Sequence, residues 1–443
     1  MSTSSAGDQA TIYQRPVELL QNLIRFDTTN PPGNEEACIR YINSLLTQAG
    51  LETTLLARSP ERPNLITRLT GQGNAPPLLL YGHVDVVTTE NQTWRQPPFE
   101  ARCVDGYIWG RGALDMKDGI AMLLTALLRA KAEGVTLPGD VILAVVCDEE
   151  VDGVYGSKYL VENHAALFKG VRYAIGEGGG FALTVGGRKL YVIMVAEKQI
   201  CSVRAIVRGP GGHGSVPMRG GTMSRLADFL RRLEQHRLPV HVTPAARQMF
   251  TAMSAALPFP TNWVIRQLIN PALSDRLLEV MGAQGRLLDP LLHNTVNATI
   301  VQGGHKINVI PSEIVVQLDG RLLPGLRPED LLGELRQVAG DAVEFEVIRY
   351  DPGPKEPDMG LFDTLADVLR EADPAGVPIP HVLSAVTDAR FFSQLGIQTY
   401  GFLPVDLAAE LIDTVHAADE RIPVEAVEFG TRAIYAALQR FGR

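Results

Sequence analysis

The stretch Leu78-Leu79-Leu80-Tyr81-Gly82-His83-Val84-Asp85 joins an apolar run to a histidine and a carboxylate. A second stretch repeats this pattern, because the apolar residues Val141 to Cys147 lead into Asp148-Glu149-Glu150. Between them lies a glycine-rich turn, Gly110-Arg111-Gly112-Ala113-Leu114-Asp115. Short apolar runs predict buried strands, and open α/β sheets hold their sites at the carboxyl ends of such strands. A histidine and several carboxylates at these ends predict a site for divalent metal.

Outward from these stretches, residues 15–196 alternate between helical and strand patterns, which predicts a largely parallel sheet with helices on both faces. From residue 197 to 350 the order of elements is that of a smaller α+β unit, and α/β character returns after Pro352-Gly353-Pro354. We therefore predict an α/β fold with a discontinuous domain, residues 1–196 and 351–443, and an inserted domain, residues 197–350.

Residues 244–292 of the insert form an extra helical segment with apolar pairs. One interpretation is a helical hairpin packed on its own domain, and the other is a gate over the substrate site. We expect the hairpin.

The composition excludes several classes of partner. The chain has 443 residues, a net charge of −9 and no run of five Lys or Arg, which argues against nucleic acid and anionic membranes as partners. Its longest helical apolar stretch, Ile120 to Leu128, is nine residues, against the roughly 20 that a membrane span requires. The four cysteines show no paired spacing, and Met1 to Asp8 lack the features of a secretory signal. We expect a cytoplasmic protein acting on a small substrate.

Each candidate residue also has a plainer interpretation. His83 and Asp85 share a face of a strand, so Asp85 can accept one imidazole N–H while the other ring nitrogen binds metal, yet a histidine at a strand end can be purely structural. Asp115 can be a helix N-cap, and Glu149-Glu150 a solvated turn. Their joint occurrence after apolar runs or in a glycine-rich turn favours a metal centre. Glu177, after another apolar segment, and His416 are further candidates.

With these motifs in place, the chain resembles a known family from about residue 15 to its end. The family is that of the cocatalytic zinc metallopeptidases, which includes aminoacylase, carboxypeptidase G, carboxypeptidase S and succinyl-diaminopimelate desuccinylase. The motifs that carry the resemblance are Gly82 to Asp85, Asp105 to Lys117, Asp148 to Glu150, Gly209 to Ser215, Asn308 to Pro311 and His416.

The resemblance implies two Zn²⁺ ions, with Mn²⁺ or Co²⁺ as alternatives, in a zinc-peptidase-like catalytic domain. Asp115 would bridge the ions, His83 and Glu177 would complete one site, and Glu150 and His416 the other. Glu149 would be the general base and Asp85 would orient His83. Two cations roughly 3.5–4 Å apart can activate a water and polarise a carbonyl, and a glutamate can then carry its proton to the departing amine.

The resemblance gives His213 a role in the partner subunit of a homodimer. In that family the corresponding histidine lies in the inserted dimerisation, or lid, domain and stabilises the oxyanion in the other subunit's site. An alternative interpretation of the same segment is a dinucleotide fingerprint, Gly209-x-Gly211-x-x-Gly214, and with it an NAD-linked oxidoreductase. No second strand with a terminal acidic residue follows at the expected distance, which argues against that alternative.

Two residues, Asn308 and Arg321, resemble positions at which relatives bind a substrate carboxylate, and Arg390 is a third candidate for this contact. An Arg fork suits a carboxylate, although each arginine can equally form a surface ion pair. Residues 197–350 hold 17 Lys or Arg against 14 Asp or Glu, whereas the rest holds 24 against 36, so the insert is the basic part. We expect amide hydrolysis of N-acyl amino acids or of small peptides with a free carboxylate, against the alternative of a catalytically silent binding protein.

One position departs from the family pattern. Gly176 stands where aminoacylase and carboxypeptidase S relatives often have an acidic residue before the glutamate ligand, here Glu177, and three further glycines follow. We expect this change to affect support of the second metal and the width of the pocket.

Overall fold

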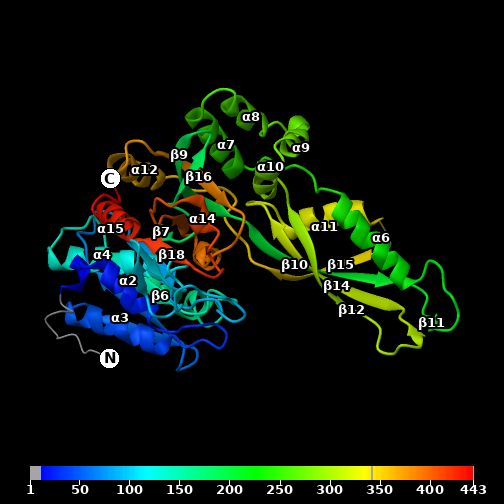
Figure 1. Ribbon diagram of the computed structural model, residues 1–443, viewed down its shortest axis with the longest axis horizontal. Helices are drawn as coiled ribbons and strands as arrows, with labels where there is room; N and C mark the ends of the chain where they lie inside the picture. Colours follow the sequence, from blue (N-terminus) through cyan, green and yellow to red (C-terminus); the bar gives the residue numbers. More distant parts are fainter. Residues whose placement is uncertain (1–10, 341–342, 443) are drawn as a thin grey trace.

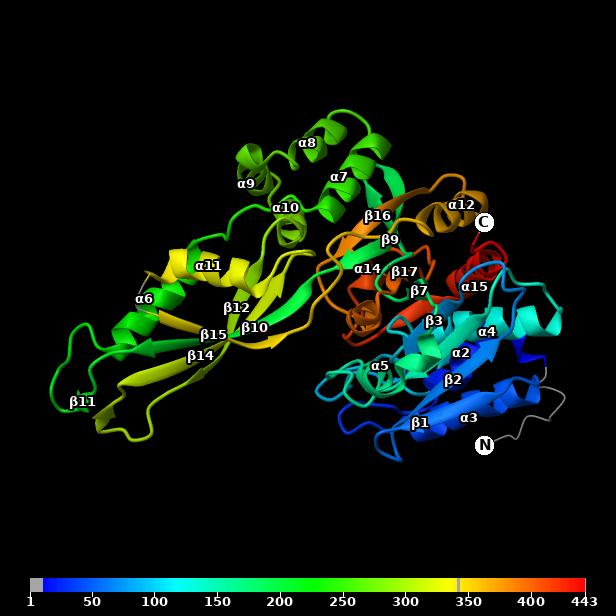
Figure 2. The same cartoon turned by 180° about the vertical axis from the view of Figure 1, so that it is seen from behind.

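The computed structural model describes residues 11–340 and 343–442 and contains two separate main sheets in an elongated molecule (Figures 1 and 2). The expectation for Met1 to Asp8 lies outside the described residues. Both described chain ends lie beside the larger sheet, and the smaller sheet extends away from it. Within the described ranges, no helix has both the length and the apolar character needed to cross a membrane.

The larger sheet is mostly parallel, as the alternation of elements predicts. Its strands lie in the order β1 (Thr53–Ala57), β2 (Pro63–Leu69), β6 (Val141–Val146), β3 (Leu78–His83), β7 (Tyr173–Gly176), β17 (Gln398–Gly401), β9 (Arg188–Glu197) and β16 (Val377–Leu383), with β8 (Ala182–Val185) paired to β9. Strands β6, β3, β7 and β17 are parallel to one another, and β9 is parallel to β16. Strands β1 and β2 add an antiparallel edge.

Alternate residues of the central strands enter two different cores, because successive side chains of a strand point to opposite faces. Leu78 and Leu80 of β3 pack in the core on one face, whereas Leu79 and Tyr81 pack in the core on the other. The first face is covered by α2 (Pro16–Ile24), α3 (Glu36–Gln48), α4 (Lys117–Ala132), α12 (Phe362–Ala372) and α15 (Val424–Leu438). The second is covered by α5 (Ser157–His164) and α13 (Ala389–Phe392).

Several short elements complete this part of the chain. They are the sheet of β4 (Arg102–Val104), β5 (Tyr107–Trp109) and β18 (Arg421–Pro423), the helix α14 (Ala409–Ile412) and the 3-10 turns Ile12–Gln14, Ala165–Phe168 and Ser393–Leu395.

The strand order creates an opening at the carboxyl end of β3. Strands β6 and β7 are the two neighbours of β3 in the sheet. The connection from β3 to β6 contains α4, and the connection from β6 to β7, on the other side of β3, contains α5. These two helices cover opposite faces of the sheet. Such a reversal of direction leaves a crevice beyond the strand ends, where α/β proteins place their ligands.

The smaller sheet is antiparallel and forms an extended unit that we call the arm, residues 199–243 and 293–350. Its strand order is β12 (Thr295–Gln302), β14 (Glu313–Leu322), β10 (Gln199–Arg208) and β15 (Val343–Tyr350). Helices α6 (Thr222–Gln235) and α11 (Pro328–Ala339) cover one face with an apolar core. A short two-stranded antiparallel ribbon of β11 (Gly212–His213) and β13 (Val309–Ile310) lies at its far end (Figure 1).

The helical segment, residues 244–292, packs on the larger sheet, which differs from the expectation that it packs on its own domain. It comprises α7 (Pro244–Ala256), α8 (Thr261–Gln267), α9 (Pro271–Val280), α10 (Ala283–Leu288) and the 3-10 turn Asp289–Leu291. Met249 and Phe250 of α7 share one core with Leu190 of β9 and Ile379 of β16. The reason is that β9 and β16 present apolar side chains, and α7 removes them from water.

Candidate metal centre

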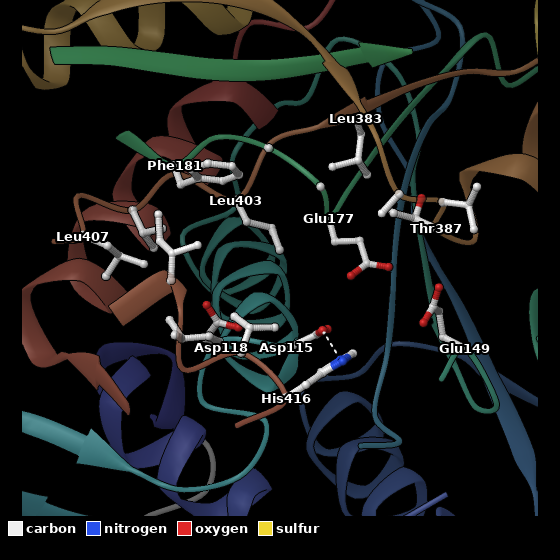
Figure 3. Close-up of a pocket in the computed structure, with 18 of the residues that line it drawn as sticks. Asp115, Asp118, Glu149, Glu177, Phe181, Leu383, Thr387, Leu403, Leu407 and His416 are labelled. Atoms are coloured by element: carbon white, nitrogen blue, oxygen red, sulfur yellow. Dashed lines mark hydrogen bonds and ion pairs between the residues drawn. The ribbon is translucent and has the colours of Figure 1, made fainter. Parts of the chain in front are cut away.

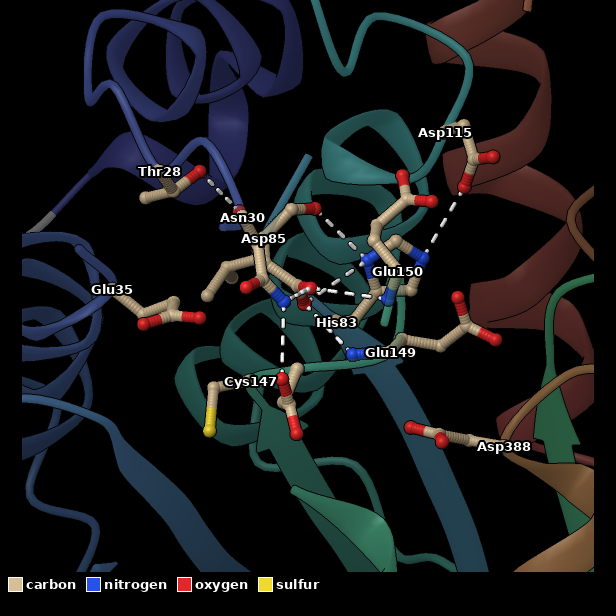
Figure 4. Close-up of polar contacts among 12 residues, drawn as sticks. Thr28, Asn30, Glu35, His83, Asp85, Asp115, Cys147, Glu149, Glu150 and Asp388 are labelled. Carbon is tan, nitrogen blue, oxygen red and sulfur yellow. Dashed lines mark hydrogen bonds and ion pairs between the residues drawn. The ribbon is translucent and has the colours of Figure 1, made fainter. Parts of the chain in front are cut away.

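Three adjacent strand ends place three of the predicted residues together. His83 is the last residue of β3, and Glu177 directly follows β7. Glu150 follows β6 by four residues, and His83 is in register with Val146 of that strand. The parallel pairing of β6, β3 and β7 therefore delivers these side chains to one edge of the sheet, where His83 and Glu150 are seen in Figure 4 and Glu177 in Figure 3.

Two loops distant in sequence add Asp115 and His416. Asp115 lies two residues before α4, and His416 lies between α14 and β18. His416 Nε2 is 3.0 Å from Asp115 Oδ2 and 3.3 Å from Glu150 Oε2. His83 Nε2 is 3.2 Å from Asp115 Oδ1 and 3.6 Å from Glu177 Oε2. All five predicted ligand residues thus meet around Asp115 (Figures 3 and 4).

The donor atoms fit divalent cations. His83 Nε2 and Glu150 Oε1 are buried and form no hydrogen bond, although Asp115 and Glu177 oxygens lie close to the imidazole nitrogen. Ligand atoms of His83, Asp115 and Glu150 lie within 4.8 Å of one another, as do those of His83, Glu149 and Glu177. One imidazole nitrogen among carboxylate oxygens is a donor set that zinc, manganese or cobalt can use.

The electrostatics of the cluster show an excess of negative charge. Burial, followed by the charge of Glu177, raises the pKa of Glu149 well above its usual range. Hydrogen bonds to Asp115 and Glu150 raise the pKa of His416 to about 10. Burial lowers the pKa of His83, but Glu177 and its other carboxylate neighbours raise it by more, and the net shift is upward. Cations bound at this place would relieve the repulsion among the carboxylates.

Asp85 lies beside His83 and also forms hydrogen bonds to the backbone of Glu149 and Glu150. His83 Nδ1 is 3.0 Å from the backbone oxygen of Asp85 and 3.5 Å from its carboxylate, so the carbonyl is the nearer acceptor. The Asp85 carboxylate accepts the backbone N–H groups of Glu149 and Glu150 at 3.2 and 3.1 Å. It also accepts a hydrogen bond from Asn30 at 2.9 Å. Sequence analysis missed Asn30 because no pattern links residues 55 positions apart.

Arg390 is the one predicted substrate contact that the structure brings to this cluster. Its Nη1 is 4.0 Å from Glu149 Oε1, and its Nε is buried without a hydrogen-bond partner. The same guanidinium donates to the Thr387 carbonyl and lies 3.6 Å from Asp351.

The other predicted contacts lie in the arm. His213 is exposed on β11 with Nδ1 2.7 Å from Ser215 Oγ, and the backbone of Asn308 accepts a hydrogen bond from Gly214. The β11–β13 ribbon that carries them is at the end of the arm farthest from the large sheet (Figure 1). Arg321, on β14, pairs with Asp319 at 2.8 Å. Within a single chain these residues are not brought to the metal-ligand cluster.

A cavity of about 380 Å³ adjoins the cluster and has two contrasting sides. The ligand side carries Asp115, Glu149, Glu150, Glu177 and His416. Most of the remaining lining is apolar, and we call it the apolar wall: Leu114, Phe181, Leu383, Leu403, Val405, Leu407, Ile412 and Val415. Phe181, Leu403 and Leu407 lie across the cavity from Glu149 in Figure 3, and Asp118 and Thr387 also line the cavity. Sequence analysis missed the apolar wall because its residues come from separate loops and strand ends without a shared period.

The structure explains the glycine at position 176 and tests the glycine-rich segment Gly209 to Gly214. A side chain at Gly176 would meet the Tyr81 ring, with 2.3 Å between its Cβ and Tyr81 Cζ, so Tyr81 already fills the space at this position. The segment Gly209 to Gly214 leads from β10 into strand β11, and α6 begins only at Thr222. A dinucleotide fingerprint requires a strand, a tight turn and a helix, so this context contradicts the NAD alternative.

Comparisons with known proteins agree with this geometry. The model of peptidase family M20/M25/M40 matches residues 79–440. The chain is 31% identical over 368 residues to the N-fatty-acyl-amino acid synthase/hydrolase PM20D1 of Xenopus tropicalis, covering 80% of this chain and 70% of that protein. It is 27% identical to aminoacylase-1 of Sus scrofa, covering 92% and 90% of the two chains.

A solved structure shows the same fold. The M20 family metallo-carboxypeptidase Sso-CP2 from Sulfolobus solfataricus has a TM-score of 0.67 at 16% identity, covering 97% of this chain and 99% of that one. The predicted fold class and the predicted family are confirmed. The chain belongs to peptidase family M20/M25/M40, and it is a metal-dependent hydrolase of the amidohydrolase and metallopeptidase type.

Proposed function

We propose that this protein hydrolyses the amide bond of N-acyl amino acids whose acyl group is apolar. The observation that carries the proposal is the two-sided cavity, with carboxylates and His416 on one side and the apolar wall on the other (Figure 3). A hydrocarbon chain that leaves water for the apolar wall gains roughly 0.8 kcal/mol for each buried CH₂. The similarity to an N-fatty-acyl-amino acid synthase/hydrolase and to aminoacylase-1 supports the same substrate class.

In this proposal two Zn²⁺ ions are held by five side chains. Asp115 is shared, His83 and Glu177 complete one site, and Glu150 and His416 complete the other. Bound divalent ions polarise the substrate carbonyl and lower the pKa of water. Mn²⁺ or Co²⁺ would satisfy the same nitrogen and oxygen donors.

Glu149 is proposed as the general base that takes a proton from the attacking water and delivers it to the departing amine. Its neighbour Asp85 fixes the backbone that carries it. Arg390, whose buried Nε is unsatisfied, is proposed to bind the carboxylate of the amino acid.

We also propose a homodimer in which the inserted domain, residues 197–350, supplies residues to the partner's site, while residues 1–196 and 351–443 form the catalytic domain. Edge strand β12 exposes Ile300 and Val301, and an open edge can pair with another chain. His213 and Asn308 lie together at the end of the arm. A second copy paired through the arm would allow His213 to stabilise the oxyanion, while Asn308 and Arg321 contact substrate.

Removal of the C-terminal residue from small peptides is a second candidate. It is favoured by 27% identity to a probable carboxypeptidase S-like 2 of Dictyostelium discoideum.

We propose that the protein is located in the cytoplasm. All four cysteines lie within the described residues and are free, as is usual for proteins of the reducing cytoplasm.

A chain-length series tests the substrate. We expect kcat/KM for N-acyl amino acids to rise from acetyl to dodecanoyl, and a chelator to abolish turnover. Leu407→Asn in the apolar wall should reduce the dodecanoyl-to-acetyl preference about tenfold. Leu395→Asn, which makes the same change at an exposed leucine outside the cavity, is the control. Preference for acetyl substrates, or cleavage of dipeptides alone, would contradict the proposal.

A further inference from the structure

An ion pair that the proposed mechanism does not use joins two loops of the metal-ligand cluster. Arg111 and Glu420 have side chains that are 1% and 0% exposed, and Arg111 Nη1 donates to Glu420 Oε2 at 2.5 Å. Arg111 lies on the loop that leads to Asp115, and Glu420 follows His416 by four residues. The pair therefore links segments 309 residues apart in the sequence.

Glu420 fixes the loop that carries Asp115. Its Oε1 accepts the backbone N–H groups of Leu114 and Asp115 at 2.7 and 3.2 Å, and its Oε2 accepts that of Gly112 at 3.2 Å. A buried carboxylate that receives three backbone donors and a guanidinium is fully satisfied. Movement of Asp115 therefore requires these bonds to break.

Arg111 and Gln92 fix the backbone of His416. Arg111 Nη2 donates to the His416 carbonyl oxygen at 3.2 Å, and Gln92 Nε2 donates to the same oxygen at 2.9 Å. Gln92 Oε1 in turn accepts a bond from Arg111 at 3.0 Å. His416 has a φ of 62°, in the left-handed region that costs energy for a residue with a Cβ. Such a conformation persists because its surroundings hold it.

The two proposed cation sites differ in how their ligands are supported. His83 and Glu177 sit at the ends of paired strands, whereas His416 lies on a loop between α14 and β18 and its side chain is 51% exposed. We propose that Arg111 and Gln92 are positioning residues that set the place of His416, and that Glu420 does the same for Asp115. This inference rests on the ligand assignment of the proposed function. The site completed by His416 thus depends on Gln92, and the site completed by His83 and Glu177 does not.

Zn²⁺ titration of metal-free protein against a chromophoric chelator tests this inference, with stoichiometry from elemental analysis. Gln92→Ala should weaken one of two Zn²⁺ sites about tenfold and leave the other unchanged, because groups that orient metal ligands contribute 10–100-fold to affinity. Arg111→Lys should weaken both sites, and the site completed by His416 more strongly, because Arg111 contacts the His416 carbonyl as well as Glu420. Glu420→Gln should weaken both, since Asp115 is shared. Co²⁺ absorption spectra of Gln92→Ala should match those of the wild type at one equivalent and differ at two.

Gln21→Ala is the matched control. Gln21 Nε2 donates to the carbonyl of Ala101 at 2.8 Å, and Ala101 also has a positive φ, of 53°. Both Gln21→Ala and Gln92→Ala lose a hydrogen bond to a loop carbonyl, so we expect them to lower the melting temperature to a similar extent. Gln21→Ala should nevertheless bind both ions as the wild type does. The inference is overturned if Gln92→Ala and Arg111→Lys bind both ions normally, if Gln92→Ala weakens both sites equally, or if Gln21→Ala behaves in the same way as Gln92→Ala. No substrate enters this titration, so a protein with these affinities but no hydrolysis would refute the proposed function alone.

Discussion

Glu149 and Glu150 are neighbours in the chain but face different groups. Glu150 Oε2 lies 3.3 Å from His416, whereas Glu149 Oε1 lies 4.0 Å from Arg390. Their backbone N–H groups are both held by Asp85, so each carboxylate keeps its own direction. This division underlies the proposal that one glutamate carries a proton and the other binds a cation.

Replacing each glutamate in turn should separate these roles. Glu149→Gln should lower kcat by about 10²- to 10⁴-fold while both ions stay bound, because a proton carrier is lost and no ligand is. Glu150→Gln should release one ion as well as lower kcat. Steady-state kinetics and elemental analysis of the same samples provide the measurement. Loss of an ion in Glu149→Gln would assign Glu149 to the ligand set, as its proximity to His83 and Glu177 also allows.

His381 should make stability depend on pH. This half-buried residue of β16 has a buried Nδ1 without a hydrogen-bond partner, and desolvation lowers its pKa to about 4. The unfolded chain, with a histidine pKa of about 6.5, binds the proton first. The stabilisation is therefore complete above about pH 6.5 and is lost as pH falls toward 4, by up to about 3 kcal/mol.

Urea unfolding of His381→Gln at several pH values measures this effect as a difference from the wild type. Between pH 6.5 and 4, the free energy of unfolding of the wild type should fall by up to about 3 kcal/mol more than that of His381→Gln. His236→Gln, at an exposed histidine, should show no such shift. Parallel pH profiles for His381→Gln and the wild type would refute the prediction.

Residue types at strand ends could be predicted from the sequence, whereas their partners could not. His83, Glu150 and Glu177 follow apolar runs, and such runs mark strand ends. Glu420 and Gln92 act through loops that meet only in three dimensions, and neither follows a strand or carries a periodic signal. The same holds for Asn30.

At the scale of elements, α7 should contribute stability through its contact with the large sheet. Phe250→Ala should lower the free energy of unfolding by about 3–5 kcal/mol, because the ring is fully buried against β9 and β16 and its loss leaves a cavity. Phe259→Ala removes the same atoms from a ring that is 80% exposed, and should change it by about 0.5 kcal/mol or less. Equal effects in urea unfolding would show that α7 does not pack on the sheet.

Central strands are easier to predict than edge strands. All residues of β3 and β6 are buried, so their sequences are continuous apolar runs between turn signals. Sequence analysis does not predict β16, because Pro378 and Pro380 argue against a strand interior. The structure places β16 at the edge of the sheet, paired to β9 alone, where a missing N–H is tolerated.

At the scale of the molecule, mixing inactive variants tests whether His213 acts across a dimer. In a mixed dimer of His213→Ala and Glu149→Gln, one site receives an intact Glu149 from one subunit and an intact His213 from the other. Random reassortment should therefore restore about a quarter of wild-type activity. Each variant alone should stay inactive. No gain on mixing, with dimers present by light scattering, would place His213 outside the partner's site.

The predicted smaller α+β unit is present as a separate sheet with two helices, since helical and strand periods read locally identify elements, whereas its antiparallel pairing is not predicted. Which sheet the helical segment joins is a different matter. The same apolar stripe could pack on the sheet of the arm or on the larger sheet. In the structure it packs on the larger sheet because β9 and β16 present apolar side chains there.

The docking of the helical segment on β9 and β16 changes how the arm is tethered. The chain passes between the two parts at residues 197–199, 236–244, 291–295 and 350–362, so four covalent links connect them. A domain joined by one flexible linker can rotate freely, whereas four separated connections restrict the rotation of the arm relative to the larger sheet. The direction in which β11 and β13 point is therefore set by the fold of the single chain, so in the proposed homodimer the chain itself would fix the spacing between the two catalytic centres.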